Sequence, residues 1–528
     1  MNPRLPMLLG TADHGGLPPR VKIVATLGPA SDSPEMIEKL VATGVGVFRL
    51  NFSHGSLDAQ LERLNRVRAV TERMGRSICV MGDLQGPKMR VGPVPDFVEG
   101  GGLIVNAGDD VLFRADHDEA EMNGSGDDVA AVLGTTFDEM FNDTEPGQRV
   151  LINDGAIRML AVDRRKGQWL RCRVTVGGRI TSSKGINLPE TDLNMPAITP
   201  KDWECVEWGI RHGVDAFALS FVRNAAEVNE LKERLSSVVS IDEEFGADPM
   251  ATHTPVIAKI EKPQAIEALD EIIEAADGVM VARGDLGVEM ETQQVPVAQK
   301  YIIERAKKQG KPVIVATQML ETMIDNPLPT RAEASDVANA VFDGADAVML
   351  SGETAVGKHP DLVVETMRRI TEAAESWIDH LPHQPTETDL PEYPFRSAAL
   401  AVGAWHVAKH AKVKLVAVWS ESGGMARYLS QTGLRVPILS FSSSPVACRR
   451  MNFLGGVLPV ESEPPASGLL SDWTDQVEKL IIDRGYARRG DRVILIAGKP
   501  LGSVQGQDAM AILRIGDPGS GFRSHDEH

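Results

Sequence analysis

The sequence lacks any apolar segment that approaches a membrane span, and it contains only four cysteines in 528 residues. A membrane-spanning helix needs about 20 consecutive apolar residues. Residues 1–20 interleave proline and charge with a short apolar stretch, so they make a poor signal peptide. The cysteines lie far apart, without the spacing of a metal site or a disulfide framework: Cys79, Cys172, Cys205 and Cys448. We therefore expect a cytoplasmic protein with no membrane partner.

An excess of positive charge is also missing. The chain has 74 acidic against 55 basic residues, for a formal net charge of −19. Proteins that bind nucleic acid neutralise its phosphates with clustered lysine and arginine, so we expect no nucleic-acid partner. A ligand that carries phosphate has to be held by a few local basic groups against an unfavourable overall field.

What the sequence does contain is a series of eight short apolar segments, each rich in valine, isoleucine or alanine. Such segments are typical of parallel strands buried on both faces. They are Val21–Gly28, Gly46–Ser53, Ser77–Leu84, Ala216–Val222, Val256–Glu261, Gly278–Asp285, Pro312–Gln318 and Ala347–Thr354. Helical patterns lie between most of them: Pro34–Ala42, Leu57–Arg73, Thr199–His212, Ala225–Leu235, Pro263–Ala276, Gln294–Lys308, Arg331–Phe342 and Pro360–His380. This alternation predicts an α/β fold with a closed (β/α)₈ TIM barrel, although strand count alone leaves an open doubly wound sheet possible.

Two regions interrupt or follow this alternation. The interval after the third strand is rich in glycine and has alternating patterns, which predicts an inserted small β domain. After the proline-rich segment 382–394, a second α/β unit begins. The expected organisation is a tail at 1–20, the barrel at 21–89 and 190–380, the β domain at 90–189, a C-terminal α/β domain at 381–516 and a flexible tail at 517–528.

Polar residues cluster where the barrel strands are predicted to end, which is where catalytic groups of such barrels project. Strand periodicity places Lys259 and Glu261 on one face of the fifth strand. A structural ion pair would explain these two residues taken alone. Further charged and hydroxyl residues at the other strand ends, including Arg49, Asp285 and Thr317, are not explained by stability and indicate a functional site.

These side chains fit phosphoryl transfer. Glu261 and Asp285 are two carboxylates that could share one Mg²⁺, because that ion prefers oxygen ligands and accepts substrate oxygens as well. Arg49, Arg90 and Lys259 are fixed cations able to neutralise a transferring phosphoryl group. The sequence has no Gly-x-x-x-x-Gly-Lys-Ser/Thr loop and no protein-kinase signature, which excludes those two classes.

At these residues the chain closely resembles the pyruvate kinase family from about Val21 to Ile515. The motifs that carry the resemblance are Arg-Leu-Asn-Phe-Ser-His-Gly at 49–55, Ala-Lys-Ile-Glu-Lys at 258–262, Met-Val-Ala-Arg-Gly-Asp-Leu-Gly-Val-Glu at 280–289, Ala-Thr-Gln-Met-Leu-Glu at 316–321 and Met-Leu-Ser-Gly-Glu-Thr-Ala at 349–355. The resemblance implies Mg²⁺-dependent transfer of a phosphoryl group from phosphoenolpyruvate to ADP, the last step of glycolysis, with Mn²⁺ as a possible substitute. It also implies that the inserted domain is a small β-barrel lid, that the C-terminal domain is regulatory and that the chain forms a homotetramer.

The resemblance further implies roles for individual residues. Lys259 would stabilise the phosphoryl group in flight, and Arg49 would hold the substrate phosphate. Glu261 and Asp285 would hold the metal, and the backbone amides of Gly284 and Asp285 would bind the substrate carboxylate. Thr317 would lie beside the carbon that receives a proton, and a water relay would supply it. The nucleotide side would be formed by Asn51, Phe52, Ser53, His54, Arg90 and Lys184.

One departure from the family pattern concerns the monovalent cation. Many members bind K⁺ with Asn, Ser, Asp and Thr side chains, and here Leu84 stands at the threonine position. Lys88 stands where those members carry glutamate. An ammonium group can replace a monovalent cation electrostatically, so we predict activity that does not require K⁺.

In the C-terminal domain, the stretch that matches the phosphate-binding loop of many family members contains Ser420, Ser422, Gly423 and Gly424. Hydroxyls and glycines suit an anion site, but Glu421 opposes a phosphate. We expect a phosphorylated effector such as AMP or a sugar monophosphate rather than fructose bisphosphate.

Two rival interpretations remain at this point. A Mg²⁺-dependent aldolase barrel would also carry Glu and Asp at strand ends, although it would not need the inserted domain or Lys184. A catalytically dead metabolite sensor would be expected to lack one of Lys259, Glu261, Asp285 and Thr317, and all four are present.

Overall fold

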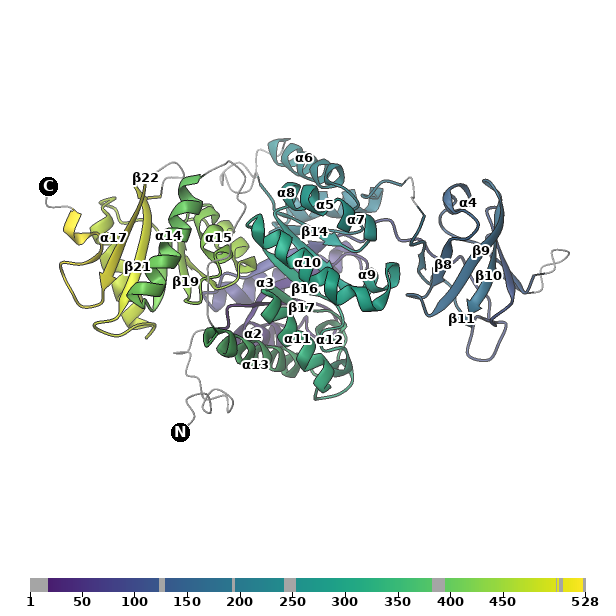
Figure 1. The fold of residues 1–528 in the computed structure, drawn as a ribbon, viewed down its shortest axis with the longest axis horizontal. Helices are drawn as coiled ribbons and strands as arrows, with labels where there is room; N and C mark the ends of the chain where they lie inside the picture. The colour runs from purple at the N-terminus through teal and green to yellow at the C-terminus, as the bar shows by residue number, and fades with distance from the viewer. Residues whose placement is uncertain are drawn as a thin grey trace.

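The computed structural model describes residues 18–122, 129–191, 195–241, 253–381, 395–499, 501–502 and 507–525. The chain folds into three units in a row, with the barrel in the middle, the inserted β domain on one side and the C-terminal domain on the other (Figure 1). Most of the expected N-terminal tail and the whole proline-rich segment 382–394 lie outside the described residues.

The central unit is a closed barrel of eight parallel strands, in the order β1-β17-β16-β15-β14-β13-β3-β2. This closure confirms the predicted TIM barrel and excludes the open sheet. The strands are β1 (Lys22–Thr26), β2 (Val45–Asn51), β3 (Cys79–Asp83), β13 (Ala216–Leu219), β14 (Val256–Ile260), β15 (Gly278–Ala282), β16 (Val313–Ala316) and β17 (Ala347–Leu350).

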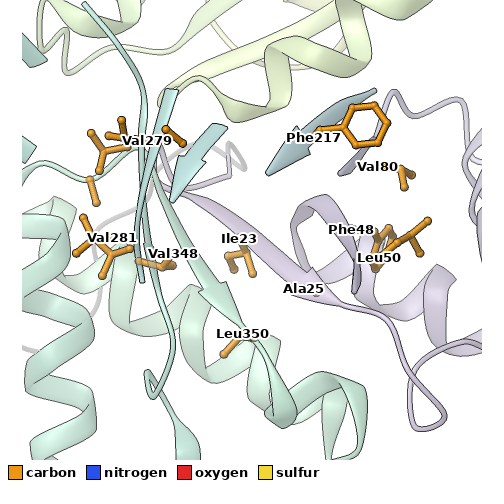
Figure 2. Close-up of a cluster of buried hydrophobic side chains, with 14 of the residues drawn as sticks. Ile23, Ala25, Phe48, Leu50, Val80, Phe217, Val279, Val281, Val348 and Leu350 are labelled. Carbon is orange, nitrogen blue, oxygen red and sulfur yellow. The ribbon is translucent and has the colours of Figure 1, made fainter. Parts of the chain in front are cut away.

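The two faces of each barrel strand enter two different apolar layers. Ile23, Phe48 and Val279 belong to the layer between the barrel and its surrounding helices (Figure 2). Their sequence neighbours Val24 and Val47 face the barrel interior. Both layers are buried, which is why these strands read as continuous apolar segments rather than as alternating ones.

The helices around the barrel begin at well-defined caps. The Ser33 hydroxyl accepts a hydrogen bond from the Met36 amide, and Thr199 and Thr330 form capping boxes with Asp202 and Glu333. The helices are α2 (Pro34–Thr43), α3 (Leu57–Arg73), α5 (Pro200–Arg211), α6 (Ala225–Ile241), α7 (Pro263–Glu267), α8 (Leu269–Ala275), α9 (Arg283–Glu289), α10 (Val295–Lys308), α11 (Arg331–Asp343), α12 (Gly352–Ala355) and α13 (Pro360–Asp379).

Two boundaries differ from the sequence-based expectation. The helix predicted over Pro263–Ala276 is divided into α7 and α8 at Ala268. The strand predicted over Gly278–Asp285 ends at Ala282, where its pairing with β16 ends, and residues from Arg283 onward form α9. The polar residues at this strand end therefore lie in the first turn of a helix.

The inserted β domain consists of a seven-stranded sheet in the order β12-β8-β9-β10-β5-β7-β6 and a two-stranded sheet of β11 and β4. The large sheet curves as a half-barrel around its own apolar core, which includes Phe113, Phe141 and Leu170. Its elements are β4 (Leu103–Val105), β5 (Asp110–Arg114), β6 (Glu121–Met122), β7 (Ala131–Leu133), α4 (Met140–Asp143), β8 (Arg149–Ile152), β9 (Ile157–Arg165), β10 (Trp169–Val176), β11 (Gly178–Ile180) and β12 (Ile186–Asn187).

The C-terminal domain is a five-stranded sheet in the order β20-β19-β18-β21-β22, in which only β22 runs antiparallel to its neighbour. Its elements are α14 (Phe395–Ala411), β18 (Leu415–Trp419), α15 (Gly424–Gln431), β19 (Ile438–Ser442), α16 (Pro445–Arg450), β20 (Val457–Glu461), α17 (Leu470–Asp483), β21 (Arg492–Lys499) and β22 (Gln507–Arg514). In the described part of the chain, no helix has both the length and the apolar character that crossing a membrane requires.

The end of the described chain differs from the expected flexible tail at 517–528. Residues Gly521–His525 form a 3₁₀ turn that packs on α17. The Phe522 ring is buried beside Trp473, and Arg523 forms ion pairs with Asp475 and Glu478. An aromatic ring and an arginine together fix this segment, although its glycine and serine content indicates a coil.

Candidate active site

The alternation of the barrel strands brings four polar side chains to one end of the barrel interior. Val24, Val47, Met81 and Ile257 face the interior, so the residues two positions further along each strand face the same way. Those residues are Thr26, Arg49, Asp83 and Lys259. All four lie at or near the carboxyl ends of their strands, where active sites of such barrels are found.

These side chains form a compact charged cluster. Asp83 Oδ2 accepts a hydrogen bond from Arg49 Nε at 2.6 Å, and Asp83 Oδ1 lies 3.4 Å from Lys259 Nζ. Arg49 also donates to the Thr26 hydroxyl at 3.1 Å. The side chains of Arg49 and Lys259 are only 12% and 11% exposed. The carboxylate of Asp83 therefore fixes both cations at the mouth of the barrel.

The electrostatics of the cluster keep its members ionised. Burial disfavours the charge of Lys259, but the carboxylates of Asp83 and Glu261 outweigh burial and raise the pKa of the lysine above its ordinary value. Burial likewise acts against the charge of Asp83, and the nearby Lys259 and Arg49 overcome it, so the pKa of Asp83 lies below its ordinary value. Lys259 is thus a permanent positive charge.

Glu261 follows β14 and is fully buried. Its Oε2 accepts a hydrogen bond from the Phe221 amide at 2.6 Å, and its Oε1 faces Lys259 Nζ at 2.8 Å and has no other partner among the described residues. Burial raises the pKa of Glu261, the Lys259 charge partly opposes this, and the charge of nearby Asp285 adds to the increase.

This arrangement fits a divalent cation that the substrate helps to bind. The described residues contain no group of three or more His, Cys, Asp or Glu side chains that would hold a metal unaided. Glu261 and Asp285 are close enough for the charge of one to raise the pKa of the other, and Glu261 Oε1 is available for a ligand. Two carboxylates completed by substrate oxygens are a usual Mg²⁺ environment.

Thr317 lies just beyond β16 in a strained backbone conformation. Its φ is +70°, and Gln318 follows at +53°. Positive φ is rare for a β-branched residue, and such strain is often found at functional sites. The Thr317 hydroxyl accepts a hydrogen bond from the Gly284 amide at 2.7 Å and donates to the Ala316 carbonyl at 2.6 Å. The structure thus joins Thr317 and Gly284, two of the residues expected on the substrate side, by a direct hydrogen bond.

Sequence reasoning did not identify Ser220, which follows β13. Lys259 Nζ donates to the Ser220 hydroxyl at 2.7 Å, and that hydroxyl donates to the Leu84 carbonyl at 2.5 Å. The next residue, Phe221, has a φ of +54°. A hydroxyl residue directly after a buried strand was the available signal, but such a residue is common at strand ends.

Comparison with known proteins identifies the family. Residues 18–364 match the family described as pyruvate kinase, barrel domain, and residues 398–513 match pyruvate kinase, alpha/beta domain. The chain belongs to the pyruvate kinase family.

Individual relatives agree over nearly the whole length. A pyruvate kinase of Mycobacterium intracellulare is 39% identical over 94% of this chain and 99% of its own. A pyruvate kinase of Methylorubrum extorquens is 40% identical over 92% of this chain and 95% of its own. The crystal structure of a pyruvate kinase from Cryptosporidium parvum superimposes with a TM-score of 0.82 at 30% identity, covering 94% of this chain and 96% of the other. The activity is therefore that of a pyruvate kinase, with phosphoenolpyruvate and ADP as substrates, and the aldolase and sensor interpretations are set aside.

The residues expected on the nucleotide side of this pyruvate kinase fall into two groups. Ser53 and His54 are exposed beyond β2, and the Asn51 side chain accepts a hydrogen bond from the Ser53 amide at 3.0 Å. The ring of Phe52 is instead buried against Trp208, with ring centroids 5.6 Å apart. The Phe52 side chain therefore packs inside the barrel wall rather than facing a ligand.

The second group lies where the chain enters and leaves the inserted β domain. Arg90 forms a backbone bridge with Gly185 and donates from Nη1 to the Ser183 carbonyl at 2.9 Å. The Lys184 carbonyl accepts a hydrogen bond from the Val91 amide at 2.8 Å. The structure brings Arg90 and Lys184 together, and among the described residues neither forms a hydrogen bond or ion pair with the Lys259 cluster.

Lys88 and Leu84, on which the predicted K⁺ independence rests, lie on the segment that leads from β3 to the inserted domain. Lys88 is exposed, and a Cβ on Gly185 would lie 3.4 Å from Lys88 Cε, so the lysine runs beside the start of the inserted domain. Leu84 is almost fully buried and offers only its carbonyl, which Ser220 occupies.

In the C-terminal loop, one of the predicted anion ligands, Ser420, is already engaged, and so is the opposing carboxylate of Glu421. The Ser420 hydroxyl accepts hydrogen bonds from the Met425 and Ala426 amides at 3.1 and 3.3 Å. Glu421 accepts one from Trp419 Nε1 at 2.8 Å and is also bound by Ser443. Ser422 remains exposed, and Gly423 has a φ of +82°.

Proposed function

We propose that Arg49 and Lys259 carry the transfer of the phosphoryl group from phosphoenolpyruvate to ADP. The observation that supports this most strongly is the fixation of Lys259 by Glu261, Asp83 and Ser220 at the barrel mouth. A cation held in this way needs no reorganisation when negative charge develops on the transferring group, which is how such groups accelerate phosphoryl transfer. Arg49, fixed by the same carboxylate, holds the substrate phosphate.

Around this pair, Glu261 and Asp285 hold Mg²⁺, or Mn²⁺ in its place. The ion supplies neutralisation of substrate oxygens when bound. The amides of Gly284 and Asp285 bind the substrate carboxylate, so the Gly284 amide exchanges the Thr317 hydroxyl for the substrate. The Thr317 hydroxyl that this releases directs a water toward the carbon that is protonated. ADP lies between Asn51, Ser53 and His54 on the barrel and Arg90 and Lys184 on the inserted domain, which acts as a lid.

We further propose that the enzyme does not require K⁺. Leu84 removes a side-chain oxygen from the position that often binds the ion, and the carboxylate of Asp83 is already neutralised by Arg49 and Lys259. Lys88 supplies a fixed positive charge on the same segment of chain, beside the lid.

An assay of ATP formation in buffer free of K⁺ and Na⁺ tests this proposal. We expect added KCl to change turnover by less than about twofold, because the cation charge is built into the chain. Lys88→Glu should lower turnover in the salt-free buffer and should recover it on addition of KCl. Lys479→Glu makes the same change at an exposed position on α17 and should have neither effect. Strong stimulation of the unmodified enzyme by KCl would contradict K⁺ independence.

For the C-terminal domain we propose a phosphorylated effector with a single phosphate, either AMP or a sugar monophosphate, at Ser422, Gly423 and Gly424. The positive φ of Gly423 and the exposed Ser422 hydroxyl support an anion site. The negative charge of the nearby Glu421 carboxylate would repel a second phosphate group. Isothermal titration with AMP, a hexose monophosphate and a hexose bisphosphate tests the choice, since binding of the bisphosphate alone would contradict it.

We also propose that the chain assembles as a homotetramer. Exposed apolar side chains on and beside α10 and α11 support association, namely Val297, Leu328 and Phe342. Light scattering coupled to size-exclusion chromatography measures the assembly directly, and a monomeric mass would contradict it.

A further inference from the structure

Helix α9 has one end in the active site and the other end beneath the inserted domain. Its first turn contains Gly284, whose amide is bound to the Thr317 hydroxyl. Its last residue, Glu289, faces the lid rather than the substrate side. The helix is seven residues long, so its two ends lie close to each other.

The last turn of α9 and the residues after it support the two neighbouring strands at the edge of the lid sheet. Asn187 Nδ2, on β12, donates to Glu289 Oε1 at 2.9 Å. Arg149, on the adjacent strand β8, lies 3.6 Å from Glu291. A Cβ on Gly155, in the turn after β8, would lie 3.7 Å from Val288, so the lid backbone also rests on α9 here. We refer to Asn187, Arg149, Glu289 and Glu291 as the lid seat.

Glu289 is also bonded to the segment that carries the expected metal ligand Glu261. Lys262 Nζ donates to Glu289 Oε1 at 3.2 Å, and Lys262 directly follows Glu261 in the chain. The Glu289 carboxylate is therefore the point where the lid, the end of β14 and the end of α9 meet. Its side chain is only 1% exposed.

A carboxylate buried this deeply requires compensation, because an ion without partners is strongly disfavoured in a protein interior. Oε1 receives both Lys262 and Asn187, whereas Oε2 is buried and has no hydrogen-bond partner among the described residues. The pocket that Glu289 borders has a volume of about 30 Å³, which is enough for a water molecule. Its two hydrogen-bond partners, one on the lid and one after β14, make the carboxylate an anchor between these segments.

We propose that Glu289 is a positioning residue that seats the lid on the last turn of α9 and so sets the orientation in which the lid meets ADP. This inference rests on the proposed role of the lid residues Arg90 and Lys184 in binding ADP. Loss of the Asn187 contact frees the edge of the lid sheet while leaving the Lys262 pair intact. The lid then samples orientations in which Arg90 and Lys184 are not aligned with bound ADP.

Steady-state kinetics of lid-seat variants test the kinetic consequence. For Asn187→Ala we expect the KM for ADP to rise about tenfold, the loss expected when one hydrogen bond to a charged group is removed, with little change in the KM for phosphoenolpyruvate. Asn187→Asp places a second carboxylate against Glu289 and should raise the KM for ADP further. Glu289→Gln keeps an acceptor for Asn187 and should recover most of the ADP affinity that Glu289→Ala loses. Asn106→Ala changes an exposed asparagine elsewhere in the lid and should leave all constants unchanged.

A distance measurement tests the lid orientation independently of activity. All four native cysteines are buried, so spin labels can be directed to Lys166→Cys in the lid and Lys39→Cys on α2, both exposed positions. We expect Asn187→Ala to broaden the distance distribution and Asn106→Ala to leave it unchanged. A distribution unaffected by Asn187→Ala, or an equal change in the KM values for both substrates, would overturn the proposal.

Lys184→Ala separates failure of this inference from failure of the proposed nucleotide site. If Lys184→Ala raises the KM for ADP and Asn187→Ala does not, the nucleotide site stands and the lid seat is wrong. If Lys184→Ala leaves that KM unchanged, the nucleotide role is wrong, and the distance distribution alone decides the lid seat.

Discussion

Lys259 is held by oxygen atoms from three segments of chain. Glu261 lies on its own strand end, Asp83 ends β3 and Ser220 follows β13. A long lysine side chain loses considerable conformational entropy when it is fixed, and in this cluster the entropy is already lost before the substrate binds. The position of the charge, and not only its presence, is therefore built into the fold.

Replacing Lys259 by Met should lower turnover by at least about 10²- to 10³-fold, the range found when one preorganised charge-stabilising group is removed. The isosteric side chain preserves packing but leaves Glu261 without its cation. A coupled assay of ATP formation at saturating Mg²⁺ measures the loss, and thermal unfolding checks that the variant is folded. Ser220→Ala removes one acceptor and keeps the charge, so its loss should be nearer tenfold. Full turnover by Lys259→Met would contradict the assigned role.

At the residue scale, the sequence located the charged residues, including the neighbouring Lys259 and Glu261, but not all of their partners. Arg49, Glu261 and Lys259 could be predicted because a charge at the end of a buried strand is costly unless it is used. Ser220 could not, because a serine at a strand end carries no comparable cost. Phe52 shows the converse, since the motif that contains it suggests a ligand contact while the ring fills the space beside Gly82, where a Cβ would lie 2.6 Å from it.

Among the elements, α5 links the barrel to the segment that enters the lid. Asp202 in its first turn forms a capping box with Thr199, and its Oδ1 also accepts hydrogen bonds from the amides of Gln85 and Gly86 at 3.0 and 3.3 Å. Asp202 is fully buried. One carboxylate thus satisfies the start of a helix and fixes the chain that leads to Lys88 and Arg90.

Asp202→Ala should destabilise the enzyme by about 2–3 kcal/mol, because it removes a cap and leaves buried amides without an acceptor. It should also raise the KM for ADP, since the segment entering the lid loses its anchor. Thr330→Ala disrupts a second capping box, at the start of α11, and is the control. It should lower the thermal midpoint by a smaller amount without changing the KM for ADP. Equal effects of both variants on that KM would show that Asp202 acts only through stability.

Two strands of the C-terminal domain could not be predicted from their local sequence, because their position at the edges of the sheet tolerates residues that are unusual inside a strand. The strand β20 was not predicted, and its sequence contains Pro459, which weakens a strand assignment. In the structure β20 lies at the edge of its sheet, where a proline is tolerated. The antiparallel strand β22 at the opposite edge was also missed. The barrel strands were predicted well because burial on both faces makes them continuously apolar.

For the whole molecule, the junction between the barrel and the C-terminal domain is built on Asp215. This carboxylate is buried at the start of β13, where it pairs with Arg68 at 2.7 Å and with Arg449 of α16 at 2.7 Å. It also accepts a hydrogen bond from the Val80 amide of β3 at 2.8 Å. The strands that end in Asp83 and precede Ser220 are therefore tied at their other ends to the C-terminal domain. Residues more than 200 positions apart meet here, and no local pattern in the sequence predicts such a meeting.

A second contact across the junction is sensitive to pH. Lys22 Nζ donates to the Val457 carbonyl at 2.5 Å and is buried. Burial lowers the pKa of Lys22 to about 8 from an ordinary value of 10.5, and the nearby Glu375 only partly opposes this. Below pH 8 the lysine is charged in both the folded and unfolded states. Between pH 8 and 10.5 the unfolded chain binds more protons than the folded one, so stability should increase with pH in this window.

The expected gain from Lys22 is about 2 kcal/mol between pH 8 and 9.5, at 1.4 kcal/mol per pH unit. Burial also lowers the pKa of Lys311 to about 8, so Lys311 changes the stability in the same direction as Lys22. The contribution of Lys22 therefore has to be measured as the difference between the unmodified enzyme and a Lys22 variant. The thermal midpoint of the unmodified enzyme minus that of Lys22→Met should rise from pH 7.5 to 9.5, because the Lys311 contribution and the lost Val457 contact cancel. A difference that is flat or falls over this range would show that Lys22 keeps its ordinary pKa, and hence that the junction around it admits water.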